Sequence, residues 1–324
     1  MISWISRNIR TWSMLGSCGA FGIAAMELPS ISDKVMILTS DLCTYSSLDR
    51  FREKYPERYY NVGIAEQNMI GIAAGMAKEG MIPFATTYAV FASARCTDQV
   101  RVNMGYMQLG VKLVGLTSGL SVGILGATHM SVEDIAIMRA IPNITILSPA
   151  DGMETIKAVL ACANSDEPVY LRLSGTMNNP VVYNEDYDFT IGKALVLREG
   201  NDIAIISTGT MVYHSLCAAE ILAEKGISSR VVNMHTIKPL DVGAIKNSCN
   251  THLIVTVEEH SIIGGLGGAV AEVLSELPDH PPLVRLGLPD MFLHAGSYAY
   301  LLERCGLTGE KIAERIINYH FRSC

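Results

Sequence analysis

The fold is decided by the stretch Tyr59-Tyr-Asn-Val-Gly-Ile-Ala-Glu66-Gln-Asn-Met-Ile-Gly-Ile-Ala-Ala-Gly-Met-Ala-Lys-Glu-Gly80. Its apolar, β-branched start predicts a short strand. Further on, Ile70, Ala73 and Ala77 are spaced three and four apart, which predicts a helix. Glu66 falls where the strand passes into the helix. Open α/β sheets place their ligand chemistry at such positions, so Glu66 is the first candidate functional residue.

Glu66 has two interpretations at this stage. An acidic residue in the first turn of a helix is favourable to the helix dipole and needs no other role. The helix, however, has small residues on nearly every side, and Gly71 and Gly75, one turn apart, would let another backbone come very close. In such a helix we expect Glu66 to be pressed against packed protein rather than water.

Composition limits the class of protein. A chain of 324 residues can bury a large core and is expected to form about two domains. Hydrophobic residues make up 49% and charged residues 18%, which excludes a disordered protein and suggests much internal or interfacial surface. The net charge of -7, without a cluster of Lys and Arg, argues against a nucleic-acid partner.

Cysteine usage and hydropathy predict a location. The eight cysteines stand singly, without metal-ligand spacing, and are expected to be reduced thiols in a cytoplasmic protein. No apolar run reaches the roughly 18 residues of a membrane span, so we expect no membrane partner. Residues 1–14 carry Arg and Ser but no acid; a plain N-terminal arm or helix is favoured over a transit peptide.

The alternation of strands and helices predicts an α/β protein with two doubly wound domains. A helix over residues 17–28, ended by Pro29, precedes a parallel sheet. The linker, residues 177–190, is rich in Asn and acidic residues, and a second, smaller α/β domain follows at 191–324, after an arm at 1–14 and a first domain at 15–176. The predicted strands are 35–39, 81–86, 111–116, 144–147 and 169–173 in the first domain, and 203–207, 229–233 and 253–257 in the second.

Other candidate residues follow strand ends. Asp41 and Leu42 come after strand 35–39, although Asp41 would equally suit a turn cap. Tyr88 and Phe91 stand at the predicted start of a helix, where aromatics usually belong to the core. His129 lies before Ser131-Val-Glu-Asp134, which resembles a capping box, and could contact a ligand or only pin its loop.

Four sequence motifs together resemble those of a known family. Asn61-Val-Gly-Ile-Ala-Glu-Gln-Asn-Met69, Pro83-Phe-Ala-Thr-Thr-Tyr-Ala-Val-Phe91, Gly126-Ala-Thr-His129 and Ser148-Pro-Ala-Asp151 resemble, in order and spacing, the pyrimidine-binding domain of thiamine-diphosphate enzymes of the transketolase family. The resemblance runs from about Asp41 to the C-terminus. It is strongest to the separately encoded C-terminal subunit of a split transketolase.

This resemblance implies roles for the candidates. Glu66 corresponds to the glutamate that hydrogen-bonds the aminopyrimidine ring nitrogen of thiamine diphosphate and so promotes loss of the thiazolium C2 proton. Phe91 corresponds to the ring stacked on the aminopyrimidine, and His129 to the histidine near the substrate's oxygens. The catalytic residues would be Glu66 and His129, and the cofactor-binding residues Asp41, Leu42, Ile64, Glu66, Tyr88 and Phe91.

Half of the family's cofactor site is missing from the sequence. The Gly-Asp-Gly signature that supplies Mg²⁺ ligands does not occur, so the resemblance implies that the thiamine diphosphate is shared and that a partner subunit holds the Mg²⁺. That partner would be the N-terminal transketolase subunit carrying the diphosphate-binding domain. An α2β2 heterotetramer is expected, and this chain is expected to hold no metal.

The implied activity is transfer of a two-carbon ketol unit from a ketose to an aldose, in carbohydrate metabolism. Three departures from the family put pentose phosphates in doubt. Leu125 replaces an aspartate, and Thr117 replaces a phosphate-binding histidine. The family's phosphate-binding arginine aligns near Gly175, and Arg172 is the only nearby substitute. The alternatives are the β subunit of a 2-oxoacid dehydrogenase and a non-catalytic scaffold subunit. In the second domain, the glycines of 264–268 suggest a possible anion cradle or a packing turn, and His260 is the best candidate residue.

Overall fold

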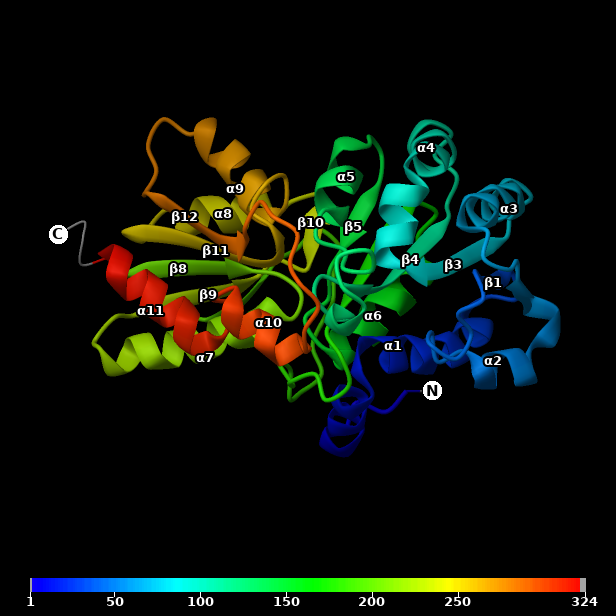
Figure 1. Cartoon of the computed structure of the whole chain (residues 1–324), viewed down its shortest axis with the longest axis horizontal. Helices are drawn as coiled ribbons and strands as arrows, with labels where there is room; N and C mark the ends of the chain where they lie inside the picture. The colour runs from blue at the N-terminus through cyan, green and yellow to red at the C-terminus, as the bar shows by residue number, and fades with distance from the viewer. Residues whose placement is uncertain (1, 321–324) are drawn as a thin grey trace.

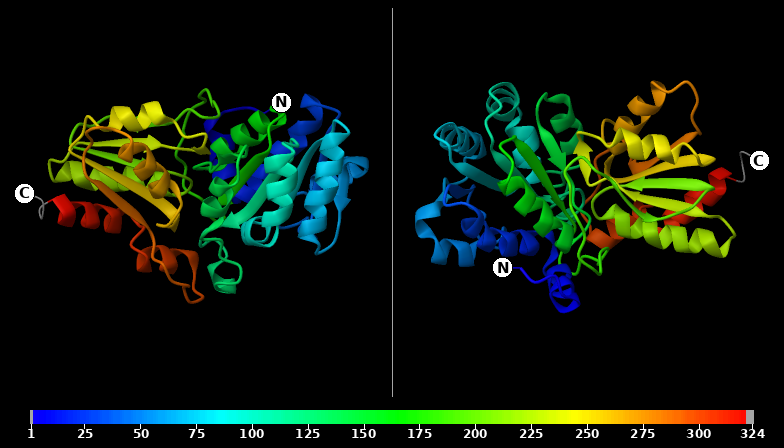
Figure 2. Two further views of the ribbon diagram at one scale, coloured as in Figure 1. Left: turned by 90° about the horizontal axis from the view of Figure 1, so that it is seen from above. Right: turned by 180° about the vertical axis from the view of Figure 1, so that it is seen from behind.

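The computed structural model describes residues 2–320. Figure 1 shows two lobes side by side, each a sheet flanked by helices, the first in blue to green and the second in yellow-green to red. The described chain ends at α11, on the side of the second lobe away from the first. Figure 2 shows the same arrangement from above and from behind. The predicted α/β class with two domains is confirmed.

The first sheet has seven strands among the described residues, in the order β10-β5-β6-β4-β3-β1-β2. All neighbours are parallel except β10 and β5. Strand β10 belongs to the second part of the chain, so the second domain completes the sheet of the first. The strands are β1 (Val35–Thr39), β2 (Tyr59–Asn61), β3 (Ile82–Tyr88), β4 (Lys112–Ser118), β5 (Thr145–Leu147), β6 (Val169–Ser174) and β10 (Thr236–Lys238).

The second sheet has five strands within residues 2–320, in the order β12-β11-β8-β9-β7. Its neighbours are parallel except β7 and β9. The strands are β7 (Leu195–Arg198), β8 (Ile203–Ser207), β9 (Ser229–Asn233), β11 (Leu253–Ser261) and β12 (Leu283–Leu288).

Helices cover both faces of each sheet, because the strands are apolar on both sides. In the first domain α1 and α6 pack on one face, and α3, α5 and the helical segment after β3 pack on the other. The helices are α1 (Ser6–Ile31), α2 (Asp49–Lys54), α3 (Glu66–Lys78), α4 (Thr97–Gln99), α5 (Asp134–Ala140), α6 (Gly152–Ala163), α7 (Met211–Glu224), α8 (Val242–Ser248), α9 (Leu266–Ser275), α10 (Tyr298–Arg304) and α11 (Gly309–His320). Short 3-10 turns are η1 (Pro56–Arg58) and η4 (Gly123–Leu125), and π-helical segments are η2 (Phe91–Arg95) and η3 (Val100–Tyr106).

Helix α1 corrects two sequence expectations. It begins at Ser6 rather than at residue 17, and kinks at Gly16, whose φ is 72°. It also runs past Pro29, because the proline removes only one N–H near the helix end and the N–H of Ser32 still bonds the carbonyl of Leu28. Trp12 is buried against α6, where a Cβ added at Gly152 would lie 2.9 Å from Trp12 backbone atoms.

By length and composition α1 also meets the criteria for a membrane-spanning helix, contrary to the sequence expectation. Half of the apolar stretch of α1, however, is buried inside the protein, so part of the helix belongs to the core.

The linker is packed rather than loose. Its Tyr183 and Tyr187 stack at 4.1 Å between ring centroids, and both hydroxyls donate to Oε1 of the buried Glu154 on α6. Asn233 of β9 donates to the same carboxylate. First domain, linker and second domain therefore meet at one buried acid, and burial raises the pKa of Glu154.

The described cysteines are free thiols. All seven of them have pKa values raised mainly by burial. Cys324 and Met1 lie outside the described residues. The predicted boundaries at 14, 176 and 190 stay predictions.

Candidate active site

The predicted site residues gather at the carboxyl ends of β1, β3 and β4. Asp41 and Leu42 follow β1, and Tyr88 is the last residue of β3 rather than the start of a helix, which corrects the sequence prediction. His129 lies on the long loop after β4. Because these strands are parallel, their carboxyl ends lie on one edge of the sheet, where ligands bind in open α/β folds.

Glu66 is the first residue of α3 and only 4% exposed. Nη1 of Arg95 donates to its Oε1 at 2.7 Å, and the Arg95 side chain is 44% exposed. The pKa of the neighbouring Cys96 thiol is raised to about 12, by burial and by the negative charge of Glu66. Glu66 therefore lies against packed protein, as predicted, with a cation on the solvent side.

An aromatic cluster lies beside this pair. The Arg95 guanidinium carbon is 4.0 Å from the centroid of the Phe91 ring. Phe91 in turn lies 5.4 Å from His129 and 6.0 Å from Tyr88, and Tyr88 lies 6.0 Å from His129. The structure thus brings together four of the predicted residues, Glu66, Tyr88, Phe91 and His129, through one residue that was not predicted.

The backbone between Phe91 and Arg95 explains this arrangement. The segment η2 is a π-helix, a conformation that occurs mostly in short pieces and frequently at functional sites. Phe91 and Arg95 lie four residues apart, so their side chains meet on one side of the segment.

The remaining predicted residues border the site. The Asp41 side chain accepts a hydrogen bond from Nδ2 of Asn61 at 2.9 Å, and its own N–H donates to Oδ1 of Asn61. Asp41 has a φ of 60°, a left-handed backbone conformation that Asp adopts more readily than most residues. Leu42 is half-buried, and Ile64 is 78% exposed and would need a partner to be covered.

A cavity of about 440 Å³ opens next to the aromatic cluster. Tyr45 links the two, because it lines the cavity and its ring centroid is 6.2 Å from that of Tyr88. Thr117 and Gly175, two of the positions that depart from the family, also line it. Its side chains are uncharged, and many carry hydroxyls: the lining comprises Leu15, Gly16, Ser17, Cys18, Gly19, Thr44, Tyr45, Ser47, Thr117, Ser121, Gly175, Thr176 and Met177. Burial raises the pKa of the Cys18 thiol to about 11.

Arg172 does not substitute for the missing phosphate-binding arginine. Its side chain is 1% exposed, and its Nε donates to Oδ2 of Asp134 at 2.9 Å while Nη2 donates to the carbonyl of Glu259. The guanidinium therefore joins the two domains and is directed away from solvent. Leu125 is exposed on its loop.

Two features of the second domain also receive a structural explanation. The N–H groups of Leu266 and Gly267 donate to the carboxylate of Glu258, so the glycine-rich turn holds an acid of the chain itself rather than a free anion. His260 is fully buried within β11, which runs on to Ser261. Its Nε2 accepts the N–H of Ala136, and burial lowers its pKa to about 4, so it ties the domains together as a neutral ring.

The capping box predicted at Ser131–Asp134 is not formed. Helix α5 begins at Asp134, its N-cap Glu133 makes no side-chain cap bond, and the Oγ of Ser131 is buried without a partner. Instead, Oδ2 of Asp134 accepts hydrogen bonds from Nε of Arg172 and from the hydroxyl of Tyr170. This carboxylate is therefore engaged in a buried ion pair and does not cap the helix. His129 is held locally by Thr128, whose Oγ1 lies 2.9 Å from its Nδ1.

Sequence reasoning missed Arg95, Tyr45 and Asn61 as members of the site. The spacing of Phe91 and Arg95 was the only signal for the arginine. Asn61 opens the motif Asn61–Met69, but nothing in that motif indicated its contact with Asp41. Tyr45 had no signal, because it reaches Tyr88 through tertiary structure.

The residues fit one half of a thiamine-diphosphate site. A buried carboxylate next to an aromatic face provides what an aminopyrimidine requires, a proton-sharing group at the ring edge and a flat surface for stacking. Among residues 2–320 no group of three His, Cys, Asp or Glu side chains is placed to hold a metal ion.

Fold and site thus define the pyrimidine-binding type of α/β protein, followed by a smaller α/β domain. Residues 18–179 match the family model of the transketolase pyrimidine-binding domain, and residues 192–312 that of the transketolase C-terminal domain. The chain belongs to the transketolase family.

Three similar proteins are informative. The chain is 43% identical to a putative transketolase C-terminal section of Methanocaldococcus jannaschii, covering 92% of this chain and 94% of the relative. It is 44% identical to a 6-deoxy-6-sulfo-D-fructose transketolase subunit of Clostridium sp. (strain MSTE9), covering 89% of each. A solved structure described as a split gene transketolase, inactive beta4 tetramer, has a TM-score of 0.85 at 39% identity, covering 94% of this chain and 97% of that one.

Proposed function

We propose that this chain is the C-terminal subunit of a split, thiamine-diphosphate-dependent transketolase that transfers a two-carbon ketol unit from a ketose donor to an aldose acceptor. The observation that carries the proposal is Glu66, a buried carboxylate at a helix start, whose partner Arg95 lies over the ring of Phe91. That ring is close to Tyr88 and His129. The family membership and the similarity to split-transketolase subunits support it.

Each side chain has a role in this proposal. When bound, thiamine diphosphate supplies the nucleophilic carbon for carbon–carbon bond cleavage. Glu66 would hold a proton at the aminopyrimidine ring nitrogen, and Phe91 and Tyr88 would cover the ring face and exclude water. Asp41, Leu42 and Ile64 would border the ring. His129 is suited to hydrogen-bond the substrate's hydroxyl and carbonyl oxygens or to move a proton between them.

The other half of the site would come from a partner. The sequence has no Gly-Asp-Gly signature, so the diphosphate and its Mg²⁺ would be bound by an N-terminal subunit. The solved split gene transketolase is an inactive beta4 tetramer, which agrees with a need for a second kind of subunit. We propose an α2β2 assembly in the cytoplasm, with the cofactor between unlike subunits.

The cavity beside the aromatic cluster suggests the substrate. Its lining from this chain has hydroxyl groups but no Lys, Arg or His. Such a surface suits the hydroxyls of an uncharged sugar chain and offers no cation to a terminal phosphate. We therefore propose an unphosphorylated ketose end on this side. A negatively charged end, as in the sugar named for the Clostridium relative, would have to be bound by the partner.

The test is co-expression with a candidate N-terminal subunit that contains Gly-Asp-Gly, followed by co-purification. Turnover of a ketose panel should require both chains and thiamine diphosphate. The panel pairs each ketose with its phosphorylated form and includes a 6-sulfonated ketose. Full activity of this chain alone would refute the subunit proposal. Preference for phosphorylated donors would refute only the substrate proposal.

A lipoyl-domain acyl-transfer assay on the same complex separates this function from that of a 2-oxoacid dehydrogenase. A complex that binds thiamine diphosphate but turns over neither substrate class would instead favour a scaffold.

A further inference from the structure

The second domain has a cavity of about 430 Å³ that the proposed function does not use. It lies at the edge of the second sheet, where β11 and β12 end, which is the side of an open α/β sheet at which ligands bind. Its volume falls within the range of small-molecule sites, about 300–1,000 Å³. The residues that line it are Ile262, Arg285, Gly287, Pro289, Met291, Leu293, Arg304, Cys305 and Arg315.

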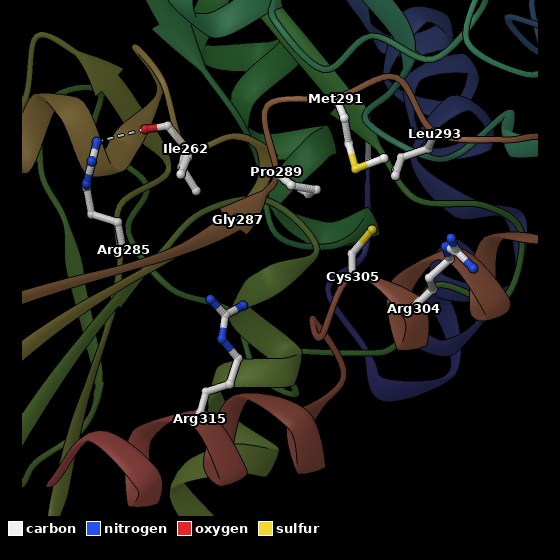
Figure 3. A pocket seen from close by; sticks show the side chains of 9 residues that line it. All are labelled: Ile262, Arg285, Gly287, Pro289, Met291, Leu293, Arg304, Cys305 and Arg315. Atoms are coloured by element: carbon white, nitrogen blue, oxygen red, sulfur yellow. Dashed lines mark hydrogen bonds between the residues drawn. The ribbon is translucent and has the colours of Figure 1, made fainter. Parts of the chain in front are cut away.

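Three arginines from three elements surround this cavity. In Figure 3 Arg285 stands on one side, Arg304 on the other, and Arg315 extends from α11 between them. The lining contains no Asp or Glu, although the chain as a whole has a net charge of -7. The cavity is therefore positively charged, although the chain as a whole is negatively charged.

The arginines retain hydrogen-bonding capacity. Nη1 of Arg285 donates to the carbonyl of Ile262 at 2.8 Å, and Nη1 of Arg304 donates to the hydroxyl of Tyr300 at 3.2 Å. Within residues 2–320 none of the three forms an ion pair with a carboxylate, and Arg315 has no hydrogen-bond partner. Its guanidinium lies near the turn after α10, since a Cβ added at Gly306 would be 3.6 Å from its Nη1.

Structural roles explain Arg285 and Arg304 but not Arg315. Arg285 is on β12, an edge strand, and charged residues on edge strands prevent pairing with other chains. Arg304 lies in the last turn of α10, where a cation favours the helix dipole. Arg315 lies in the middle of α11 and has neither role. A guanidinium group without a carboxylate partner, beside an apolar wall, suits a phosphate group attached to a carbon skeleton.

We propose that this cavity binds a small organic phosphate monoester, with Arg315 on the phosphate and Met291 and Leu293 against the organic part. Arg285 and Arg304 add positive charge on either side of Arg315. The site is separate from the proposed active site, because none of its lining residues belongs to the aromatic cluster or its neighbouring cavity. It depends on the proposed function in no way, and binding is measured without turnover.

The test is calorimetric titration of the purified chain with phenyl phosphate, with inorganic phosphate and phenol as comparisons. We expect one molecule per chain, weaker binding at high salt, and weaker binding of both comparisons. Arg315→Gln should raise the dissociation constant about tenfold or more, because it removes a charge-assisted hydrogen bond. Arg304→Gln should raise it less, because it removes only a nearby positive charge. Arg101→Gln, an exposed arginine in the first domain, is the matched control and should change nothing.

Four outcomes would overturn the proposal. The first is no saturable binding, and the second is equal weakening by Arg101→Gln, which would indicate a general charge effect. Inorganic phosphate binding as tightly as the ester would exclude a role for the apolar wall. Loss of binding in the complex with the N-terminal subunit would mean that the arginines face that subunit. Unchanged melting temperatures of the variants confirm that folding is intact.

Discussion

Arg95 donates to Glu66 at 2.7 Å across 29 residues of sequence, and the same guanidinium lies 4.0 Å from the centre of the Phe91 ring. One planar cation thus contacts both groups that we assign to the aminopyrimidine, the carboxylate and the aromatic face. It occupies Oε1 of Glu66, while no hydrogen bond is formed to Oε2 within the described residues. We therefore infer that Arg95 positions the proposed catalytic acid.

The Arg95→Met and Arg95→Lys variants should differ in an informative way. Methionine removes both the charge and the hydrogen bond to Glu66, so kcat should fall about tenfold or more. Lysine keeps the charge but not the planar stacking, so it should retain most of kcat and weaken cofactor binding. The measurements are kcat and the dissociation constant of thiamine diphosphate in the assembled complex. Identical effects of the two variants on both quantities would exclude the positioning role.

Glu66→Gln should fold and assemble but lose nearly all turnover. The amide oxygen can still accept the hydrogen bond from Arg95, so the local structure is kept, while the exchangeable proton is lost. A loss of about 10²–10⁴-fold is typical for an acid–base group. Glu79→Gln, an exposed acid directly after the same helix, is the control and should retain full activity. Wild-type turnover by Glu66→Gln would refute the assignment.

The sequence predicted the fold well wherever a strand is apolar along its whole length. Val35–Thr39 and Ile203–Ser207 were predicted with their observed bounds, because continuous burial on both faces requires such runs. The antiparallel edge strands β7 and β10 were not predicted. Strand β10 has three residues and β7 is only partly buried, so neither has an apolar pattern of its own.

For the site, local pattern alone left Glu66, Tyr88, Phe91 and His129 with ordinary structural explanations, and the family resemblance was needed to group them. The contact between Glu66 and Arg95 could not be predicted, since it depends on how α3 packs beside the π-helical segment. The buried pair Arg172–Asp134 was missed for the same reason: a strand and a helix must assemble before the charges meet.

The exposed face of α3 is the expected contact with a second subunit. A Cβ added at Gly71 or at Gly75 would meet nothing within 4 Å in this chain, so these glycines relieve no internal crowding. Gly71→Ala should therefore stabilise the isolated chain by up to about 1 kcal/mol through helix propensity. Gly71→Leu and Gly75→Leu should fold equally well but weaken assembly, because their side chains would hold a second backbone away.

Size-exclusion chromatography with light scattering measures the assembly, and denaturant unfolding the stability. Ala223→Leu, an equally exposed enlargement on α7 of the second domain, is the matched control. If both glycine variants assemble as well as this control does, the face of α3 is not an interface.

Stability should depend on pH through Glu258. Burial raises its pKa from 4.5 to about 7, although the N–H groups of Leu266 and Gly267 favour the charged form. A carboxyl whose pKa is higher in the folded state contributes stability that is complete below pH 4.5 and is lost as pH rises through about 7. Between these two pH values the free energy of unfolding should fall by up to about 1.4 kcal/mol per pH unit, and at higher pH this group adds no further loss.

The Glu258→Gln variant removes this titration and keeps an oxygen acceptor for one backbone N–H. Denaturant unfolding in steps of one unit between about pH 5 and pH 8 should therefore show wild type losing stability relative to the variant, mostly below neutral pH. Asp151 titrates in both proteins, and the pKa of His260, about 4, lies below this range. Glu276→Gln, an exposed acid at the end of α9, should follow wild type. Parallel pH dependences of wild type and Glu258→Gln would show that Glu258 is already ionised throughout this range, with its two N–H donors outweighing its burial.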